Sequence, residues 1–260
     1  MAPLLSFSSV SINFGGIQAL DEVTFDVNEG QIFGLIGPNG AGKTTVFNVL
    51  SRIYKPDSGA VSFAGKNLLR TAPHRIPSLG IARTFQNVIL FPVMNVMDNV
   101  LVGGHSWMST SPLLSMVRWP TVRRDEKKAR ERAEWLMEYL NLTSVAGRGV
   151  GELPFPTRKR IELARALMAN PKLLLLDEPA AGLTHQEVTE LGDLVMRIRK
   201  DFSVTILLVE HHMALVMGIC EHIWVLDFGR KIAEGGPQQI QQDPAVIRAY
   251  LGEAPEEKTA

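Results

Sequence analysis

The sequence predicts an α/β fold in which a mixed core sheet carries a phosphate-binding loop, with an antiparallel β-subdomain and a helical subdomain attached. Three observations predict this fold. Residues Gly37–Thr45 fit the phosphate-cradling pattern G-x-x-x-x-G-K-[ST]. Residues 173–178 are four leucines followed by Asp and Glu, which is typical of a strand buried on both faces. Residues 95–169 carry mainly helical patterning.

The surroundings of the phosphate-binding pattern support it. Residues 31–36 form a short apolar run expected of a buried strand, and residues 46–50 continue as a helix. Glycines let backbone N–H groups approach phosphate oxygens, and the helix N-terminus adds unpaired donors. We expect Lys43 to reach the β- and γ-phosphates and Thr44 to bind Mg²⁺. The alternative is an ordinary glycine turn before a helix.

Composition restricts the class of protein. The chain has 260 residues, is 45% hydrophobic and has 27 basic and 27 acidic residues, so it lacks the basic excess of a dedicated nucleic-acid binder. Its single cysteine, Cys220, excludes an internal disulfide and is expected to be a buried apolar residue. The start of the sequence lacks a signal-peptide pattern, and no run of about eighteen apolar residues occurs. We expect a cytosolic protein that reaches a membrane only through partners.

The first third is expected to add antiparallel strands to the nucleotide core. Strands are predicted at Leu5–Phe14, Ala19–Val27 and Ala60–Ala64, with a turn at Gly65–Asn67. The aromatic ring of Phe14 lies at a glycine turn. Two roles stay open for it, which are packing in the core and stacking on a nucleotide base.

The middle of the chain contains one predicted strand and a long amphipathic helix. Residues 81–86 are expected to form a strand that ends on Gln86. Residues 125–140 carry an apolar stripe at helical spacing with mixed charges around it. A solvated helix face with intrahelical ion pairs is favoured over a lipid or nucleic-acid patch.

The leucine strand ends in two carboxylates, which are costly to bury unless they are used. We expect Asp177 to hold Mg²⁺ and Glu178 to polarise the attacking water. A helix cap would explain only one of the two acids. A capping box at Thr184–Glu187 predicts a helix to about Lys200.

A further core strand is predicted at residues 204–209, followed by Glu210, His211 and His212. A lone histidine at such a position is more often structural, but two at the edge of a parallel sheet are better placed for a ligand. Residues 223–234 are expected to form a hairpin, and residues 254–260 a frayed tail.

Together these residues resemble an ATP-binding-cassette (ABC) ATPase over nearly the full length of the chain. The resemblance implies a P-loop NTPase fold of the ABC ATPase type, as one domain over residues 1–253 with a helical subdomain at about 95–169. It rests on Walker A at Gly37–Thr45, the Q-loop at Gln86, the Walker B aspartate and catalytic glutamate at Asp177 and Glu178, the D-loop at Ala181–Leu183, the switch histidine at His211 and the adenine-stacking aromatic at Phe14.

The resemblance also implies roles for individual residues, with ATP and Mg²⁺ as the bound species. The implied catalytic residues are Lys43, Gln86, Glu178 and His211, and the implied Mg²⁺ ligands are Thr44, Gln86 and Asp177. The implied nucleotide-binding residues are Phe14, Gly37, Pro38, Asn39, Gly40, Ala41, Gly42, Lys43, Thr44 and Thr45.

Within this family the chain looks most similar to the ATP-binding subunits of branched-chain amino acid importers. That implies a second cassette, two membrane permease subunits and, indirectly, a substrate-binding protein as partners, with the chain at the inner face of the membrane and no nucleic acid. The segments that carry this narrower resemblance are residues 83–87, 178–183, 207–213, 215–219 and 249–252.

One segment departs from the family pattern. The signature Leu-Ser-Gly-Gly-Gln should precede the helix at 158–168, but the sequence there is Leu153-Pro-Phe-Pro-Thr157. In the family, the signature serine and glycine amides contact the γ-phosphate held by the opposite subunit. Pro154 removes the hydroxyl, and the two prolines remove backbone donors, although a first helical turn tolerates proline. Losing two charge-assisted hydrogen bonds of about 1.5–3 kcal/mol each weakens that half-site by about a hundredfold or more.

This departure favours a heterodimer with one competent and one degenerate ATP site, because a homodimer would have two damaged sites. The alternative is a diverged homologue with poor activity.

For the whole protein, the main hypothesis is the ATP-hydrolysing motor subunit of an importer. The rival is a soluble cassette protein of DNA repair or translation, which usually carries coiled coils, zinc cysteines or a second cassette that this sequence lacks. A nucleotide-binding regulator without turnover is a third alternative, against which intact Glu178 and His211 argue.

Overall fold

The computed structural model describes residues 2–107 and 120–251, and the chain divides into two compact units. The first unit comprises residues 1–73 and 175–260, and the second comprises residues 74–174. The predicted tail at 254–260 lies outside the described residues. The first unit contains β1 (Leu5–Phe14), β2 (Ile17–Val27), β3 (Ile32–Ile36), α1 (Lys43–Leu50), β4 (Ser58–Phe63), β5 (Lys66–Asn67), α6 (His185–Phe202), β8 (Thr205–Val209), α7 (Met213–Ile219), β9 (His222–Asp227), β10 (Arg230–Gly235), α8 (Pro237–Gln242) and α9 (Pro244–Leu251).

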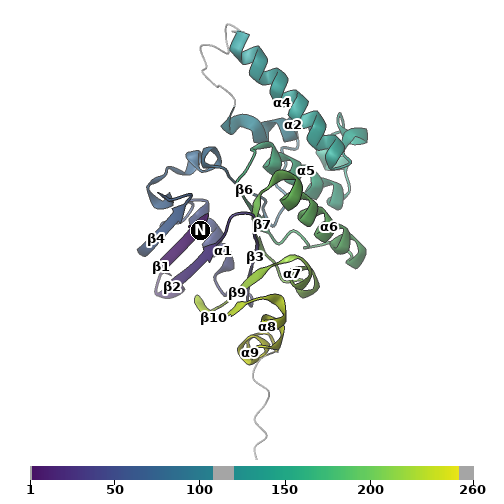
Figure 1. Ribbon diagram of the computed structural model, residues 1–260. Helices are drawn as coiled ribbons and strands as arrows, with labels where there is room; N and C mark the ends of the chain where they lie inside the picture. Colours follow the sequence, from purple (N-terminus) through teal and green to yellow (C-terminus); the bar gives the residue numbers. More distant parts are fainter. Residues whose placement is uncertain (1, 108–119, 252–260) are drawn as a thin grey trace, which may run out of the picture. The chain divides into compact units, whose positions relative to one another are not determined.

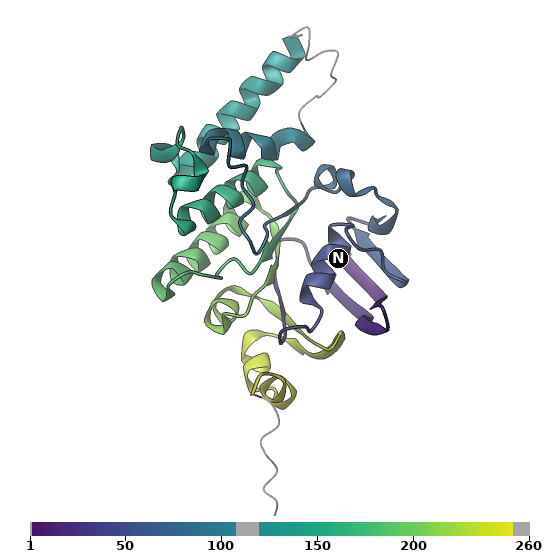
Figure 2. The same cartoon turned by 180° about the vertical axis from the view of Figure 1, so that it is seen from behind.

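Two sheets form the first unit. The antiparallel sheet has the order β2-β1-β4-β5, and the core sheet runs β10-β9-β3-β8-β7, where β7 is Leu173–Asp177. In the core sheet β3 is parallel to both β8 and β9, whereas β10 is antiparallel to β9. The predicted mixed core sheet with an antiparallel β-subdomain is therefore confirmed. Figures 1 and 2 show α6 and α7 on one side of β3 and α1 on the other.

An aromatic cluster joins the two sheets of the first unit. The Phe25 ring on β2 lies 4.6 Å from Phe7 on β1, 5.5 Å from Phe33 on β3 and 5.3 Å from Trp224 on β9, measured between ring centroids. All four side chains are buried. Offset and tilted ring packing of this kind contributes about 0.5–1.5 kcal/mol per pair beyond the area buried. The cluster holds β3, which leads into the phosphate-binding loop, in a rigid core.

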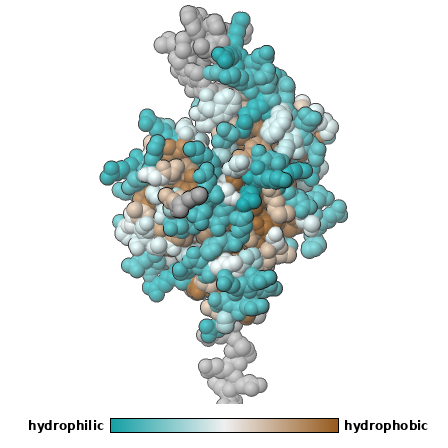
Figure 3. Space-filling model, viewed as in Figure 1, coloured by the Kyte–Doolittle hydropathy of each residue, from teal (hydrophilic) through white to brown (hydrophobic). Residues whose placement is uncertain are grey.

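The second unit is mainly helical. It contains β6 (Ile81–Arg83), α2 (Val96–Val102), α4 (Pro120–Tyr139) and α5 (Phe155–Met168). The predicted apolar stripe of α4 is buried against α2 and α5. The face of α4 visible in Figure 3 is mostly hydrophilic, as a solvated face should be. The stripe consists of Ala129, Ala133, Leu136, Met137 and Leu140.

Two predicted element boundaries differ from the structure, and one predicted helix start is found in place. β6 ends at Arg83 rather than Gln86, because the N–H of Phe85 donates to the Glu162 carboxylate at 3.1 Å instead of to a sheet ladder. Lys66–Asn67, expected within a turn, pairs with β4 as the short strand β5. The capping box at Thr184 is confirmed at the start of α6.

No helix in the described ranges is both long and apolar enough to pass through a bilayer.

Candidate nucleotide-binding and hydrolysis site

The phosphate-binding loop runs from the buried end of β3 into α1, and its shape depends on glycine. Gly37 has φ 154°, and a Cβ atom there would collide with the carbonyl oxygen of Leu226. Gly42 caps α1 in the left-handed conformation at φ 108°, and no side-chain hydrogen bond caps the helix N-terminus. The first amides of α1 are therefore open to an anion, which the helix dipole also favours.

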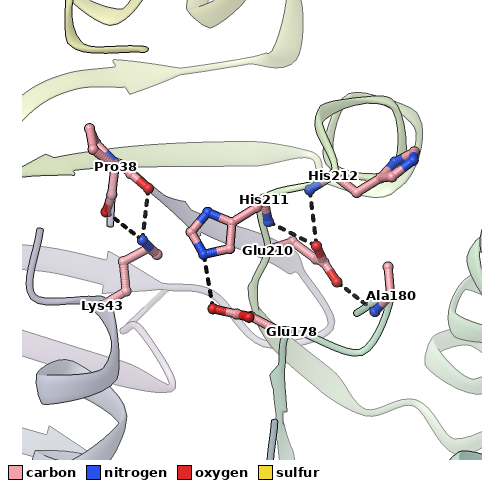
Figure 4. A network of polar contacts seen from close by, with 8 residues as sticks. Pro38, Lys43, Glu178, Ala180, Glu210, His211 and His212 are labelled. Carbon is pink, nitrogen blue, oxygen red and sulfur yellow. Dashed lines mark hydrogen bonds and ion pairs between the residues drawn. The ribbon is translucent and has the colours of Figure 1, made fainter. Parts of the chain in front are cut away.

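Lys43 is the first residue of α1, and its ammonium group lies within the loop. The side chain is buried, and its Nζ donates to the carbonyl oxygens of Gly37 and Pro38, each at 2.7 Å (Figure 4). Burial lowers the pKa of Lys43, while the charges of Glu178 and Asp177 oppose that shift. A cation held in a desolvated loop beside carboxylates is suited to binding a phosphate chain.

Glu178 and His211 form the polar pair at the ends of two core strands. His211 Nε2 lies 2.9 Å from Glu178 Oε1, and Figure 4 marks this contact with a dashed line. The backbone brings them together, since the Glu178 N–H donates to the carbonyl of Val209, the last residue of β8, at 2.9 Å. Glu178 has a left-handed backbone with φ 46°, a conformation that non-glycine residues adopt at a cost and that is enriched at functional sites.

Only one of the two adjacent histidines faces Glu178. The His212 ring points away from the pair (Figure 4), and its centroid lies 6.2 Å from that of His185 on α6. Within the described residues its Nδ1 atom is buried without a hydrogen-bond partner. The expectation that both histidines suit a ligand is therefore wrong for His212, since it is turned toward the α6 side.

The implied Mg²⁺ ligands of the first unit have suitable chemistry. Asp177 is the last residue of β7 and only 5% exposed, and Thr44 is exposed in the first turn of α1. Mg²⁺ is usually held by one or two protein oxygens together with substrate phosphates, so a carboxylate and a hydroxyl are a fitting donor set. In the described part of the chain no group of three or more His, Cys, Asp or Glu residues is arranged to hold a metal by itself.

Phe14 ends β1 with its ring substantially exposed. The side chain is 43% exposed and makes an edge contact with Tyr54, with the ring centroids 4.9 Å apart. The core-packing role considered for Phe14 is therefore wrong. Stacking of a nucleotide base on this ring stays a prediction.

Residues 20–181, more than half of the chain, match the family model described as ABC transporter. The chain belongs to the ABC transporter family. A second model, described as branched-chain amino acid ATP-binding cassette transporter, matches residues 230–256 of this ABC protein.

Similar proteins cover nearly all of this ABC chain. It is 44% identical over 252 residues to the high-affinity branched-chain amino acid transport ATP-binding protein BraF of Pseudomonas aeruginosa, covering 97% of this chain and 99% of that one. It is 42% identical to LivG of Escherichia coli over the same shares. Among solved structures, the ADP conformation of an ATP-binding cassette of an ABC transporter is 33% identical, with a TM-score of 0.83 over 97% of this chain and 100% of that one. A nucleotide-free cassette gives a TM-score of 0.82 at 33% identity, over 96% and 99%.

In the second unit of this ABC protein, α5 carries the departure from the signature motif. Pro154 is the N-cap of α5 and Pro156 lies in its first turn, so both prolines are accommodated as expected. The helix has no side-chain cap, and the Phe155 ring lies under the cationic groups of Arg158 and Lys159, at 5.6 and 5.2 Å. The segment Leu153–Thr157 thus presents an aromatic ring and two prolines at a helix start.

Gln86, which the resemblance assigns to the Q-loop, follows a residue that is bonded to α5 in this ABC protein. Gln86 is exposed in the loop after β6. Its neighbour Phe85 donates its N–H to Glu162 of α5 at 3.1 Å, and Arg165 approaches the same carboxylate at 3.8 Å. Burial raises the pKa of Glu162, and the Phe85 N–H is the largest of the contacts that oppose the shift.

Glu210, the neighbour of His211, is a functional candidate that no local sequence pattern singles out. The residue is 2% exposed, and its carboxylate accepts hydrogen bonds from the backbone N–H groups of Ala180, His211 and His212. A charged residue directly after an apolar strand was the only signal available, because the backbone donors that surround it are brought together by the fold.

Proposed function

We propose that this chain is the ATP-hydrolysing subunit of an importer for branched-chain amino acids, bound to membrane subunits at the inner face of the cell membrane. The single observation that carries the hydrolytic part is the 2.9 Å contact between Glu178 and His211 at the strand ends beside the phosphate-binding loop. The substrate class is supported by the match of residues 230–256 and by the relatives at 42–44% identity. A soluble cassette of DNA repair or translation is not favoured, because those relatives are described as transport proteins.

In the proposed mechanism, the loop amides and Lys43 bind the β- and γ-phosphates of ATP, and Phe14 stacks on the base. Glu178 accepts a hydrogen bond from the attacking water and orients it toward the γ-phosphorus. His211 positions the Glu178 carboxylate through the 2.9 Å contact between His211 Nε2 and Glu178 Oε1. Thr44 and Asp177 of the first unit would hold Mg²⁺, which would neutralise charge on the phosphate oxygens.

For the partners, we propose a heterodimer with a second cassette whose signature motif is intact. Pro154 and Pro156 at the start of α5 support this, because they take away a hydroxyl and two amide donors from the segment that should contact a partner's γ-phosphate. The competent composite site would then combine Lys43 and Glu178 of this chain with the partner's signature. ATP binding closes such a dimer, and hydrolysis reopens it.

The test is ATP hydrolysis by the complete transporter in proteoliposomes. The complex would contain this chain, its second cassette, its membrane subunits and its external binding protein. We expect leucine, isoleucine or valine to stimulate hydrolysis, with no stimulation by glutamate or lysine. Equal rates with every amino acid would overturn the proposed substrate class. Stimulation by nucleic acid, or copurification with ribosomes in place of membrane subunits, would support the rival function.

A further inference from the structure

Glu210 is a buried carboxylate for which the mechanism above has no use. It directly follows β8 and is 2% exposed. Its Oε1 atom accepts the Ala180 N–H at 2.6 Å, and its Oε2 atom accepts the N–H groups of His211 and His212 at 2.8 and 3.0 Å. Figure 4 shows the carboxylate between these donors. Three short bonds offset the cost of burying the charge.

The three donors come from two different segments. Ala180 lies two residues after Glu178, in the turn that follows β7, whereas His211 and His212 connect β8 to α7. One side chain therefore fixes the backbone on both sides of the polar pair. A separate hydrogen bond from the Glu178 N–H to the Val209 carbonyl keeps the ends of β7 and β8 next to each other. With these bonds in place, the side chains of Glu178 and His211 meet at 2.9 Å.

We propose that Glu210 is a positioning residue for ATP hydrolysis, whose carboxylate sets the separation between Glu178 and His211 by tying the turn at Ala180 to the backbone of the switch histidine. This inference rests on the proposed roles of Glu178 and His211. Glu210 has no contact with nucleotide in this account and acts only through its neighbours.

The Glu210→Gln substitution tests whether the carboxylate must accept hydrogen bonds from both segments, and it hardly changes the size of the side chain. An amide has one acceptor oxygen and one NH₂ group, so it can satisfy either Ala180 or the two histidine N–H groups, but not both sides. The backbone N–H on the other side of the side chain then faces the NH₂ group of Gln, which is itself a donor and cannot accept a hydrogen bond. A displacement of about 1 Å in a catalytic group is enough to lower the rate by about a hundredfold.

Three readouts separate positioning from a general structural role. The first is kcat for ATP hydrolysis by the assembled transporter complex, the second is the affinity of the full chain for a fluorescent ATP analogue, and the third is the ¹⁵N shift of the His211 imidazole. Glu234→Gln is the control for the Glu-to-Gln exchange itself, because Glu234 on β10 accepts hydrogen bonds from the side chains of His222 and Lys231 and does not tie backbone segments together. Glu178→Gln reports separately on the catalytic role of Glu178.

We expect Glu210→Gln to lower kcat by roughly ten- to a hundredfold, to leave nucleotide affinity within about twofold and to shift the His211 signal, with no such changes in Glu234→Gln. If Glu210→Gln does not fold, Glu210→Asp, which keeps the charge but shortens the reach, is measured in the same way. An unchanged kcat or an unchanged His211 signal would overturn the proposal, and so would an equal loss of kcat and affinity. If Glu178→Gln keeps full activity, the proposed hydrolytic mechanism fails, irrespective of Glu210.

Discussion

The imidazole Nε2 of His211 lies 2.9 Å from the carboxylate oxygen Oε1 of Glu178. An ionised carboxylate only accepts hydrogen bonds, so with Glu178 ionised the ring donates from Nε2. The pair lies where two core strands end, and Lys43 begins α1, which follows the loop after a third strand, β3, parallel to β8. This arrangement places the proposed base Glu178, its proposed orienting group His211 and the proposed phosphate-binding cation Lys43 in one part of the first unit.

The Glu178→Gln substitution should separate hydrolysis from binding. Loss of the carboxylate removes general-base assistance, and we expect the hydrolysis rate to fall by about 10²- to 10⁴-fold. Binding of ATP should persist, because Lys43 and the loop amides are unchanged. The hydrolysis rate is measured by phosphate release, and the affinity for ATP is measured by equilibrium binding. A variant that keeps more than about a tenth of the wild-type rate would contradict the role of Glu178.

Two glycines of the phosphate-binding loop should differ in their tolerance of alanine. At Gly37 a Cβ atom would collide with the Leu226 carbonyl oxygen, so Gly37→Ala must displace the loop. At Gly40 the φ is 81° and a Cβ atom would meet nothing within 4 Å, so Gly40→Ala costs only about 1–2 kcal/mol of backbone strain.

We therefore expect Gly37→Ala to abolish ATP binding and to lower the melting temperature more than Gly40→Ala does. Isothermal titration with ATP and thermal unfolding of both variants measure this difference. Equal loss of binding in the two variants would mean that the close approach of Gly37 to Leu226 does not set the shape of the loop.

Glu162→Ala should loosen the Q-loop. The substitution deletes the acceptor of the Phe85 N–H, which is held at 3.1 Å next to Gln86. We expect amide hydrogen exchange across residues 84–87 to accelerate by about tenfold or more, as for the loss of a bond of about 1.4 kcal/mol. Glu152→Ala is the control, since Glu152 is exposed and pairs only loosely with Arg148 at 3.9 Å. Unchanged exchange at Phe85 would show that Glu162 does not hold this loop.

Titration of the buried Cys220 thiol should lower the free energy of unfolding as the pH rises above 9. The thiol packs against Gly34 of β3, and burial, with a smaller contribution from Glu221, raises its pKa from 9.0 to about 12. The unfolded chain releases this proton near pH 9.0, whereas the folded chain keeps it to about pH 12. The contribution is thus complete below pH 9 and is lost toward pH 12, at up to about 1.4 kcal/mol per pH unit.

The measurement is the free energy of unfolding in urea between pH 8 and pH 10.5. We expect Cys220→Ala, although it is less stable because of the cavity, to show a shallower decline than the wild type above pH 9. Comparing slopes cancels the titration of other groups. Parallel slopes in the two proteins would show that the thiol does not titrate as described.

Local patterns were sufficient to predict most of the first unit. The Gly37–Thr45 pattern, the four leucines of β7 and the capping box at Thr184 each report on their own immediate surroundings, and each is found in place. Pairing of residues distant in sequence was harder to predict. The end of β6 at Arg83 depends on Glu162, which lies 77 residues beyond Phe85, and no local pattern contains that contact.

The same limit explains the unassigned part of the site. Glu210 follows a strand as Glu178 does, yet its role depends on an amide thirty residues away, at Ala180. His211 and His212 have the same chemistry, and only the backbone at the end of β8 decides which ring faces Glu178. Residue type identified the candidates, and the three-dimensional structure distinguishes between them.

The central claim is that Lys43 and Glu178 of this chain form one competent ATP site that needs the signature motif of another cassette. The most direct measurement compares ATP hydrolysis by this chain alone, by a mixture with its second cassette, and by the same mixture with Glu178→Gln in this chain. We expect activity only in the wild-type mixture, with a loss of about a hundredfold or more when Glu178 is replaced. Equal activity of the chain alone and of the mixture would contradict the claim, because the segment Leu153–Thr157 would then support hydrolysis by itself.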